Sequence, residues 1–203
     1  MRKARLLTAI ILATAAVSPA LVRAASVTFT VLSKAEAQNS ATVENATDIE
    51  NWVGRTNKVS GTVQFDRTAK TGSATIIIDG ASIDTGVEER NGHMRGKDWF
   101  DFDKNPQIRF VTTSVKNTGG DNYALSGNLT MKGITRSVKA TAVVKMTPAN
   151  EVTKMIGAAG DVLGVSTKFK VKLSDYGVKH PAIQAGRVSN ELDVSVRFIA
   201  SNQ

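Results

Sequence analysis

Apolar and polar residues alternate along most of the chain after residue 25, and this pattern constrains the fold more than any other feature. Successive side chains of a β-strand point to opposite faces, so the alternation predicts strands with one buried face and one wet face. Such strands are typical of antiparallel sheets. The alternating segments lie at residues 27–31, 59–65, 76–78, 108–110, 123–131, 134–146, 165–173 and 192–198.

Several long antiparallel strands with one apolar face must curl into a barrel or stack as a sandwich. The segments at 122–146 and 162–173 are long, and long strands in a steady meander favour a barrel. The sequence therefore predicts an all-β, antiparallel, eight-stranded barrel, which is just wide enough to enclose one slender ligand.

Residues 85–100 break the alternation. Thr85 followed three residues later by Glu88 matches a capping box, and this predicts a short helix that ends near Lys97. Two further irregular segments, at 33–51 and 175–189, are expected to cap an opening of the barrel.

Residues 1–24 have the pattern of a secretory signal peptide. Arg2, Lys3 and Arg5 precede an apolar run, Pro19 breaks it, and small residues surround an expected cleavage after Ala24. The run is too short to span a membrane stably. The apolar runs of all later segments are shorter than the about 18 residues that a membrane-spanning helix requires. Four of the 26 basic residues would leave with this segment, so the formal charge falls from +8 to +4 against 18 acidic residues.

The composition argues against several kinds of catalysis. The chain has no cysteine and only two histidines, which removes thiol chemistry and the usual zinc motifs. There is no G-x-S-x-G motif either. Asp101, Asp103 and Asn105 loosely resemble a calcium loop but lack its glycine and closing glutamate, so a solvated turn is the preferred interpretation. We therefore expect no enzyme activity, no catalytic residue, no metal and no cofactor.

A basic stripe at Lys168, Lys170 and Lys172 is compatible with phosphate contacts. Apolar residues alternate with these lysines, which places the lysines on the outer face without interleaved aromatic side chains. We expect them to keep that face wet, and we expect no nucleic-acid partner.

The interior can be either a hollow tube or a filled core. Small residues recur at inward positions, and both a tube and a well-interdigitated core use small and large side chains together. The pattern leaves the two alternatives open. The inward small residues are Gly61, Ala74, Gly127, Ala140, Ala142 and Thr167.

Residues 81–101 carry a specific series of motifs. In chain order they are Asp84-Thr85-Gly86, Arg90, His93-Met94-Arg95, Asp98 and Trp99-Phe100, followed by Pro106, Ile108-Arg109-Phe110 and, near the C-terminus, Ser174-Asp175-Tyr176-Gly177. This series resembles the YceI-like family of exported lipid-binding proteins over most of residues 58–199.

The resemblance implies a lipocalin-like extended barrel with an inserted helix, covering residues 25–203 after a cleaved signal at 1–24. It implies a periplasmic, non-catalytic protein that holds a long isoprenoid lipid, either a polyprenyl phosphate or a quinone, as its partner. It also favours the tube over the filled core. Residues 33–54 depart from the family pattern because they contain no histidine, so ligand contacts are not carried over to them.

Alternation and resemblance together give candidate binding residues. Ten apolar residues are expected to line the tube: Phe29, Ile78, Ile83, Met94, Trp99, Phe110, Leu125, Leu129, Val144 and Phe169. Four polar residues are candidates for the headgroup: Arg90, His93, Arg95 and Lys179. A structural alternative for His93 is a hydrogen bond to a neighbouring strand.

A second hypothesis is an exported, stress-related interaction module with a filled core and no lipid cargo. A homodimer is compatible with either hypothesis.

Overall fold

The computed structural model describes residues 26–202, and its strands form a closed antiparallel barrel. The barrel closes because β1 (Val27–Val31) pairs with both β4 (Val59–Asp66) and β10 (Glu191–Ser201). This confirms the predicted eight-stranded, lipocalin-like barrel. The other barrel strands are β5 (Thr71–Asp79), β6 (Gln107–Gly119), β7 (Asn122–Met131), β8 (Ile134–Thr147) and β9 (Val162–Lys172).

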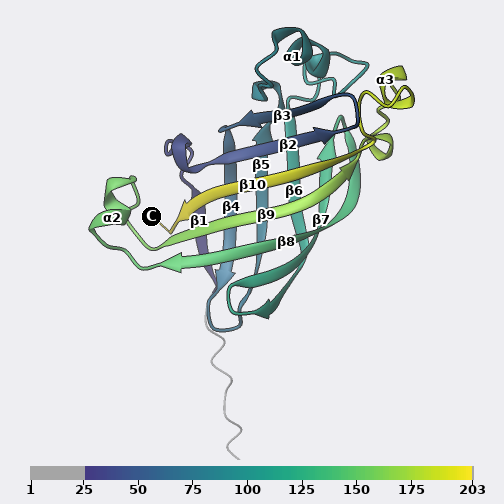
Figure 1. The fold of residues 1–203 in the computed structure, drawn as a ribbon. Helices are drawn as coiled ribbons and strands as arrows, with labels where there is room; N and C mark the ends of the chain where they lie inside the picture. The colour runs from purple at the N-terminus through teal and green to yellow at the C-terminus, as the bar shows by residue number, and fades with distance from the viewer. Residues whose placement is uncertain (1–25, 203) are drawn as a thin grey trace, which may run out of the picture.

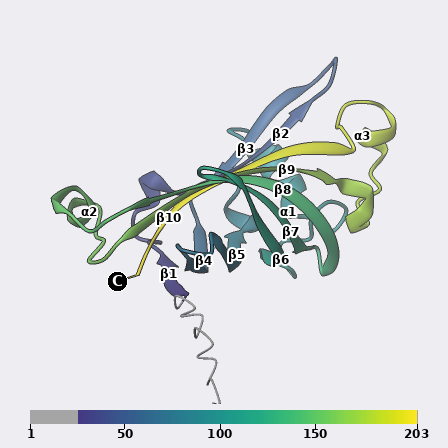
Figure 2. The same ribbon diagram turned by 90° about the horizontal axis from the view of Figure 1, so that it is seen from below.

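Two walls of the barrel face each other. In Figure 1, β8, β9 and β10 cross in front of β4, β5 and β6, and the view in Figure 2 separates the two groups. Each neighbouring pair is antiparallel, so inward-facing residues alternate with outward-facing residues along every strand. Lys132 and Gly133 connect β7 to β8 with φ angles of 53° and 72°, the left-handed conformation that a two-residue hairpin turn requires.

A further hairpin extends the sheet beyond the barrel. β2 (Ser40–Ala46) pairs with β10, and β3 (Asn51–Thr56) pairs with β2 at the edge. The expectation that residues 33–51 are irregular is therefore wrong. The buried positions of the hairpin are small or polar instead of large and apolar, so they give no period-two signal; they are Ala41, Asn45, Gly54 and Thr56.

The inserted helix α1 (Glu88–Arg95) is present, but Thr85 is not its N-cap. Val87 is the N-cap residue, and the Thr85 backbone N–H and hydroxyl both donate to Asn91 Oδ1, at 2.9 and 2.8 Å. The capping-box prediction is wrong because the Asn91 side chain binds Thr85 from inside the helix. The helix ends at Arg95, two residues before the expected end at Lys97.

Short elements cover the two ends of the barrel. The helices α1 and α3 (Pro181–Gln184) lie toward one end, where the 3₁₀ turn η3 (Leu173–Tyr176) continues from β9, and α2 (Glu151–Met155) lies near the C-terminus on the opposite side (Figure 1). The end that α1 and α3 cover is called the helix end below.

Candidate ligand-binding site

The part of the barrel away from the helix end contains a cavity of about 90 Å³, the deep cavity, whose walls are almost entirely apolar. Phe110, Leu125 and Val144 line it. Space exists beside these large side chains because neighbouring inward positions are small, namely Ala74, Ala140 and Ala142. The deep cavity therefore follows from the mixture of small and large inward residues.

A second apolar cavity of about 60 Å³, the middle cavity, lies between the deep cavity and the helix end. Ile83 and Met94 contribute to its wall. Four side chains border both cavities and form a constriction between them, which we call the inner belt: Ile78, Ile108, Leu129 and Phe169.

A third space of about 310 Å³, the mouth pocket, lies at the helix end and has both polar and apolar walls. It borders the middle cavity through shared residues: Met94, Phe100, Leu173 and Leu192. The three spaces follow one another along the barrel, and only the mouth pocket contains charged side chains.

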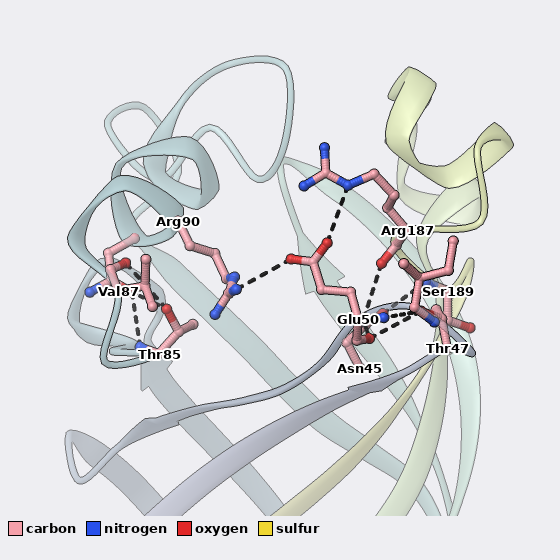
Figure 3. A network of polar contacts seen from close by, with 10 residues as sticks. Asn45, Thr47, Glu50, Thr85, Val87, Arg90, Arg187 and Ser189 are labelled. Atoms are coloured by element: carbon pink, nitrogen blue, oxygen red, sulfur yellow. Dashed lines mark hydrogen bonds and ion pairs between the residues drawn. The ribbon is translucent and has the colours of Figure 1, made fainter.

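Three charged residues meet in the mouth pocket, as Figure 3 shows. The Glu50 carboxylate lies between Arg90 of α1 and Arg187 in the segment that follows α3. Its Oε1 is 3.2 Å from an Arg90 guanidinium nitrogen, and its Oε2 is 3.3 Å from Arg187 Nε. The Arg90 and Glu50 side chains are each 25% exposed, so this pair is screened less than the surface ion pairs of the protein.

Asn45 holds the two sides of this pocket in place. Its amide nitrogen donates to the carbonyls of Glu50 (2.8 Å) and Arg187 (3.4 Å), and its Oδ1 accepts from the Ser189 backbone N–H (2.8 Å). The Asn45 side chain is buried, and a buried amide of this kind needs all these partners. The β2–β3 turn and the segment after α3 are therefore fixed relative to each other.

Aromatic rings form the other walls of the mouth pocket. Trp99 and His180 stack with centroids 4.5 Å apart, and the Arg90 guanidinium lies 5.4 Å from the ring centroid of Trp52. The Trp52 indole Nε1 is buried and has no hydrogen-bond partner within residues 26–202. An indole nitrogen only donates, and this one is buried beneath the surface of the wall, so its hydrogen bond is unsatisfied.

Asp84 anchors the loop that leads into α1. Its carboxylate accepts hydrogen bonds from the Gly86 backbone N–H (2.8 Å) and the Asn91 amide (2.7 Å). The Gly86 hydrogen bond, and next the Asn91 hydrogen bond, lower the pKa of Asp84 below its ordinary value of 3.8. The ionised carboxylate thus fixes the N-terminal end of the helix that carries Arg90 and His93.

Most of the predicted tube residues face the two apolar cavities. Trp99 instead lines the mouth pocket, because it follows α1 at the helix end. Phe29 is buried in the core cluster around β1 and lies outside the walls of both apolar cavities. The cavity-lining residues are Ile78, Ile83, Met94, Phe110, Leu125, Leu129, Val144 and Phe169.

The four predicted headgroup residues separate into two pairs. Arg90 and His93 line the mouth pocket. Arg95 pairs with Glu88 at 2.6 Å outside the pocket, and Lys179 is an exposed residue outside its walls. His93 is exposed, and within the described residues its ring makes no hydrogen bond to a strand. The alternative that His93 is held by a hydrogen bond to a neighbouring strand is therefore wrong.

Sequence reasoning missed most residues of the mouth pocket, among them Glu50, Trp52, Glu89, His180 and Arg187. They lie in segments without alternation, and two of them lie within residues 33–54, to which no ligand contacts were assigned. Composition alone offered a signal, and only for Trp52 and His180. The chain has two tryptophans and two histidines, and these are the one of each kind that lies outside the motif at 81–101.

Over residues 26–202, no group of three or more histidine, aspartate or glutamate side chains is close enough to hold a metal ion. In the same residues, the helices are too short or too polar to cross a bilayer. The lysine stripe of β9 is exposed, and Lys170 pairs with Glu191 at 2.8 Å and Asp193 at 3.6 Å, so part of its charge is already neutralised.

Curated relatives with similar sequences are UPF0312 proteins. One from Pseudomonas aeruginosa is 31% identical over 150 residues, which cover 70% of this chain and 71% of that protein. Relatives from Pectobacterium atrosepticum (31% identity, 63% of this chain) and Serratia proteamaculans (34%, 51% of this chain) match over only 64% and 50% of their own lengths.

Solved structures share the fold. The crystal structure of BcnA from Burkholderia cenocepacia aligns with a TM-score of 0.69 and 26% identity, covering 81% of this chain and 97% of BcnA. A polyisoprenoid binding domain from Saccharophagus degradans aligns with a TM-score of 0.62 and 15% identity, covering 86% of this chain and 98% of that domain. The YceI-like domain family matches residues 23–200, and the chain therefore belongs to this family.

Proposed function

We propose that this protein binds a long-chain isoprenoid lipid, a polyprenyl phosphate or a quinone, and carries or buffers it in the periplasm. The observation that supports the proposal is the series of three spaces, with two apolar cavities behind one pocket that contains charged and aromatic side chains. A ligand with a long apolar tail and one polar end fits this order.

Burial of the tail would supply the affinity. Removing apolar surface from water contributes about 25 cal/mol per Å². The headgroup would remain in the mouth pocket, beside Arg90 and His93. The description of the Saccharophagus domain as polyisoprenoid binding supports this ligand class at the level of the fold.

The size of the interior limits how the tail can enter. Cavities of about 90 and 60 Å³ are smaller than the about 300–1,000 Å³ of ordinary small-molecule pockets. The inner belt side chains must therefore move outward before a tail passes from the middle cavity to the deep cavity. Phe169 and Ile108 are only partly buried, which leaves room for such movement.

The same volumes favour a second candidate, an exported interaction module with a filled core. The two candidates differ in whether lipid accompanies the protein. The test is to purify the full chain from its native host without detergent, extract it with organic solvent, and identify lipids by mass spectrometry. Recovery of a stoichiometric isoprenoid supports the carrier, whereas an empty protein that also fails to bind added quinone or polyprenyl phosphate contradicts it.

Export is part of the proposal and rests on the signal-like segment at residues 1–24, which lies outside the described residues. Expression of the full chain in a Gram-negative host, followed by osmotic shock, should release a shortened protein that begins near residue 25. A full-length product that stays with the cytoplasmic fraction would contradict this location.

A further inference from the structure

The charges of the mouth pocket balance, and this bears on which headgroup the pocket accepts. Its walls contain two acidic residues, Glu50 and Glu89, and two arginines, Arg90 and Arg187. With both histidines neutral, the formal charge of the pocket is zero. An anionic headgroup would therefore meet carboxylates as well as guanidinium groups.

The arginines are also already paired. Glu50 contacts both Arg90 (3.2 Å) and Arg187 (3.3 Å) with different carboxylate oxygens, so it occupies the position between the two cations that a phosphate would take. A phosphate can take this position between the two guanidinium groups only after the Glu50 carboxylate leaves it.

The backbone of Glu50 is fixed by the turn that carries it. Its backbone N–H donates to Thr47 Oγ1 (2.9 Å), and its carbonyl accepts from Thr47 Oγ1 (3.1 Å) and from the buried Asn45 amide (2.8 Å). Displacing the carboxylate would leave it near a headgroup of the same charge, in a partly buried place where screening is weak.

The aromatic walls of the pocket suit an uncharged headgroup. Trp99 and His180 stack on each other and both line the pocket, so they offer it apolar ring surface.

We infer that Glu50 sets the headgroup selectivity of this protein: by pairing with Arg90 and Arg187 it makes the mouth pocket select neutral isoprenoids over isoprenoid phosphates. The inference rests on the proposed function, since it concerns the headgroup of the lipid whose tail enters the barrel.

The experiment compares farnesol with farnesyl phosphate, which share one tail, by calorimetric titration of the full chain. The wild-type protein is expected to bind farnesol about tenfold or more tightly than farnesyl phosphate. Glu50→Gln frees two arginines and should shift the ratio toward the phosphate by about tenfold or more. Adding Arg187→Gln to this variant restores the charge balance and should return the ratio toward the wild-type value.

Two further variants complete the test. Glu88 lies on α1, as Arg90 does, but its carboxylate pairs with Arg95 outside the pocket. Glu88→Gln should therefore leave the ratio unchanged. Arg187→Gln alone makes the pocket net negative and should move the ratio further toward farnesol. This variant keeps the inference testable if Glu50→Gln does not fold, because Arg187 is 64% exposed.

The outcomes separate the two proposals. A wild-type protein that binds neither probe overturns lipid binding and the selectivity together. A wild-type protein that prefers farnesyl phosphate, or a ratio that neither Glu50→Gln nor Arg187→Gln changes, overturns the selectivity alone.

Discussion

The indole of Trp99 stacks on the imidazole of His180, with ring centroids 4.5 Å apart and planes inclined by 27°. Trp99 follows α1, whereas His180 precedes α3, so the stack joins two segments that share no strand pairing. His180 has a second role at this place, because its Nδ1 accepts the Ala182 backbone N–H at 3.2 Å and caps α3. One side chain thus closes the mouth pocket and begins the neighbouring helix.

His180→Ala should therefore remove an aromatic contact and a helix cap together. We expect a loss of about 1 kcal/mol in the free energy of unfolding, measured by urea denaturation. His93→Ala is the matched control, since His93 is exposed and stacks on no ring within residues 26–202. Equal effects of the two substitutions would show that the stack contributes nothing.

Ala142→Leu should distinguish a tube from a filled core. Ala142 is 4% exposed and lines the deep cavity, so a larger side chain there occupies the space that the tail would need. If the tube binds lipid, the variant should fold and lose the lipid, as measured by native mass spectrometry. In a filled core it should instead cost about 1–3 kcal/mol of stability. Val143→Leu is the control on the outer face, where Val143 is 37% exposed.

Gly127→Ala should destabilise the barrel although the substitution adds one methyl group. A Cβ at Gly127 would lie 2.4 Å from Phe110 Cζ and 2.6 Å from the Val111 carbonyl oxygen. The ring fills the space that the glycine leaves, and overpacking of this kind costs about 1–3 kcal/mol. Gly164→Ala is the control, because its Cβ would meet only Lys145 O at 3.9 Å. Similar melting temperatures for both variants would contradict the prediction.

The loop before α1 should weaken in acid. Because hydrogen bonds hold the pKa of Asp84 below its ordinary value of 3.8, the ionised form stabilises the folded loop. This contribution is present above the ordinary pKa and is lost as the pH falls through the depressed folded pKa. The difference in melting temperature between wild type and Asp84→Asn should be constant near neutral pH and shrink below about pH 4. A difference that persists unchanged at lower pH would mean that the charge of Asp84 is not its source.

The sequence predicts the eight barrel strands because each of them carries apolar residues with period two on one face. It does not predict β2 and β3, whose buried positions Asn45 and Gly54 carry no hydrophobic signal. The buried Asn45 side chain forms hydrogen bonds with backbone atoms that are far away in the sequence. A local pattern does not show which backbone atoms the fold brings near it. The capping box fails at Thr85 for a similar reason, since Asn91 takes its hydroxyl.

For the site, alternation is sufficient to predict that Phe110, Leu125 and Val144 face the interior, because the facing of a strand residue is a local property. The mouth pocket is different. Glu50, Trp99, His180 and Arg187 come from three separate parts of the chain, and only closure of the barrel places them around one space. The sequence by itself determined the strands, the barrel and its apolar interior, since these follow from side-chain period. Only the tertiary structure decided which charges meet at the mouth, because ion pairing depends on distances between segments that no local pattern encodes.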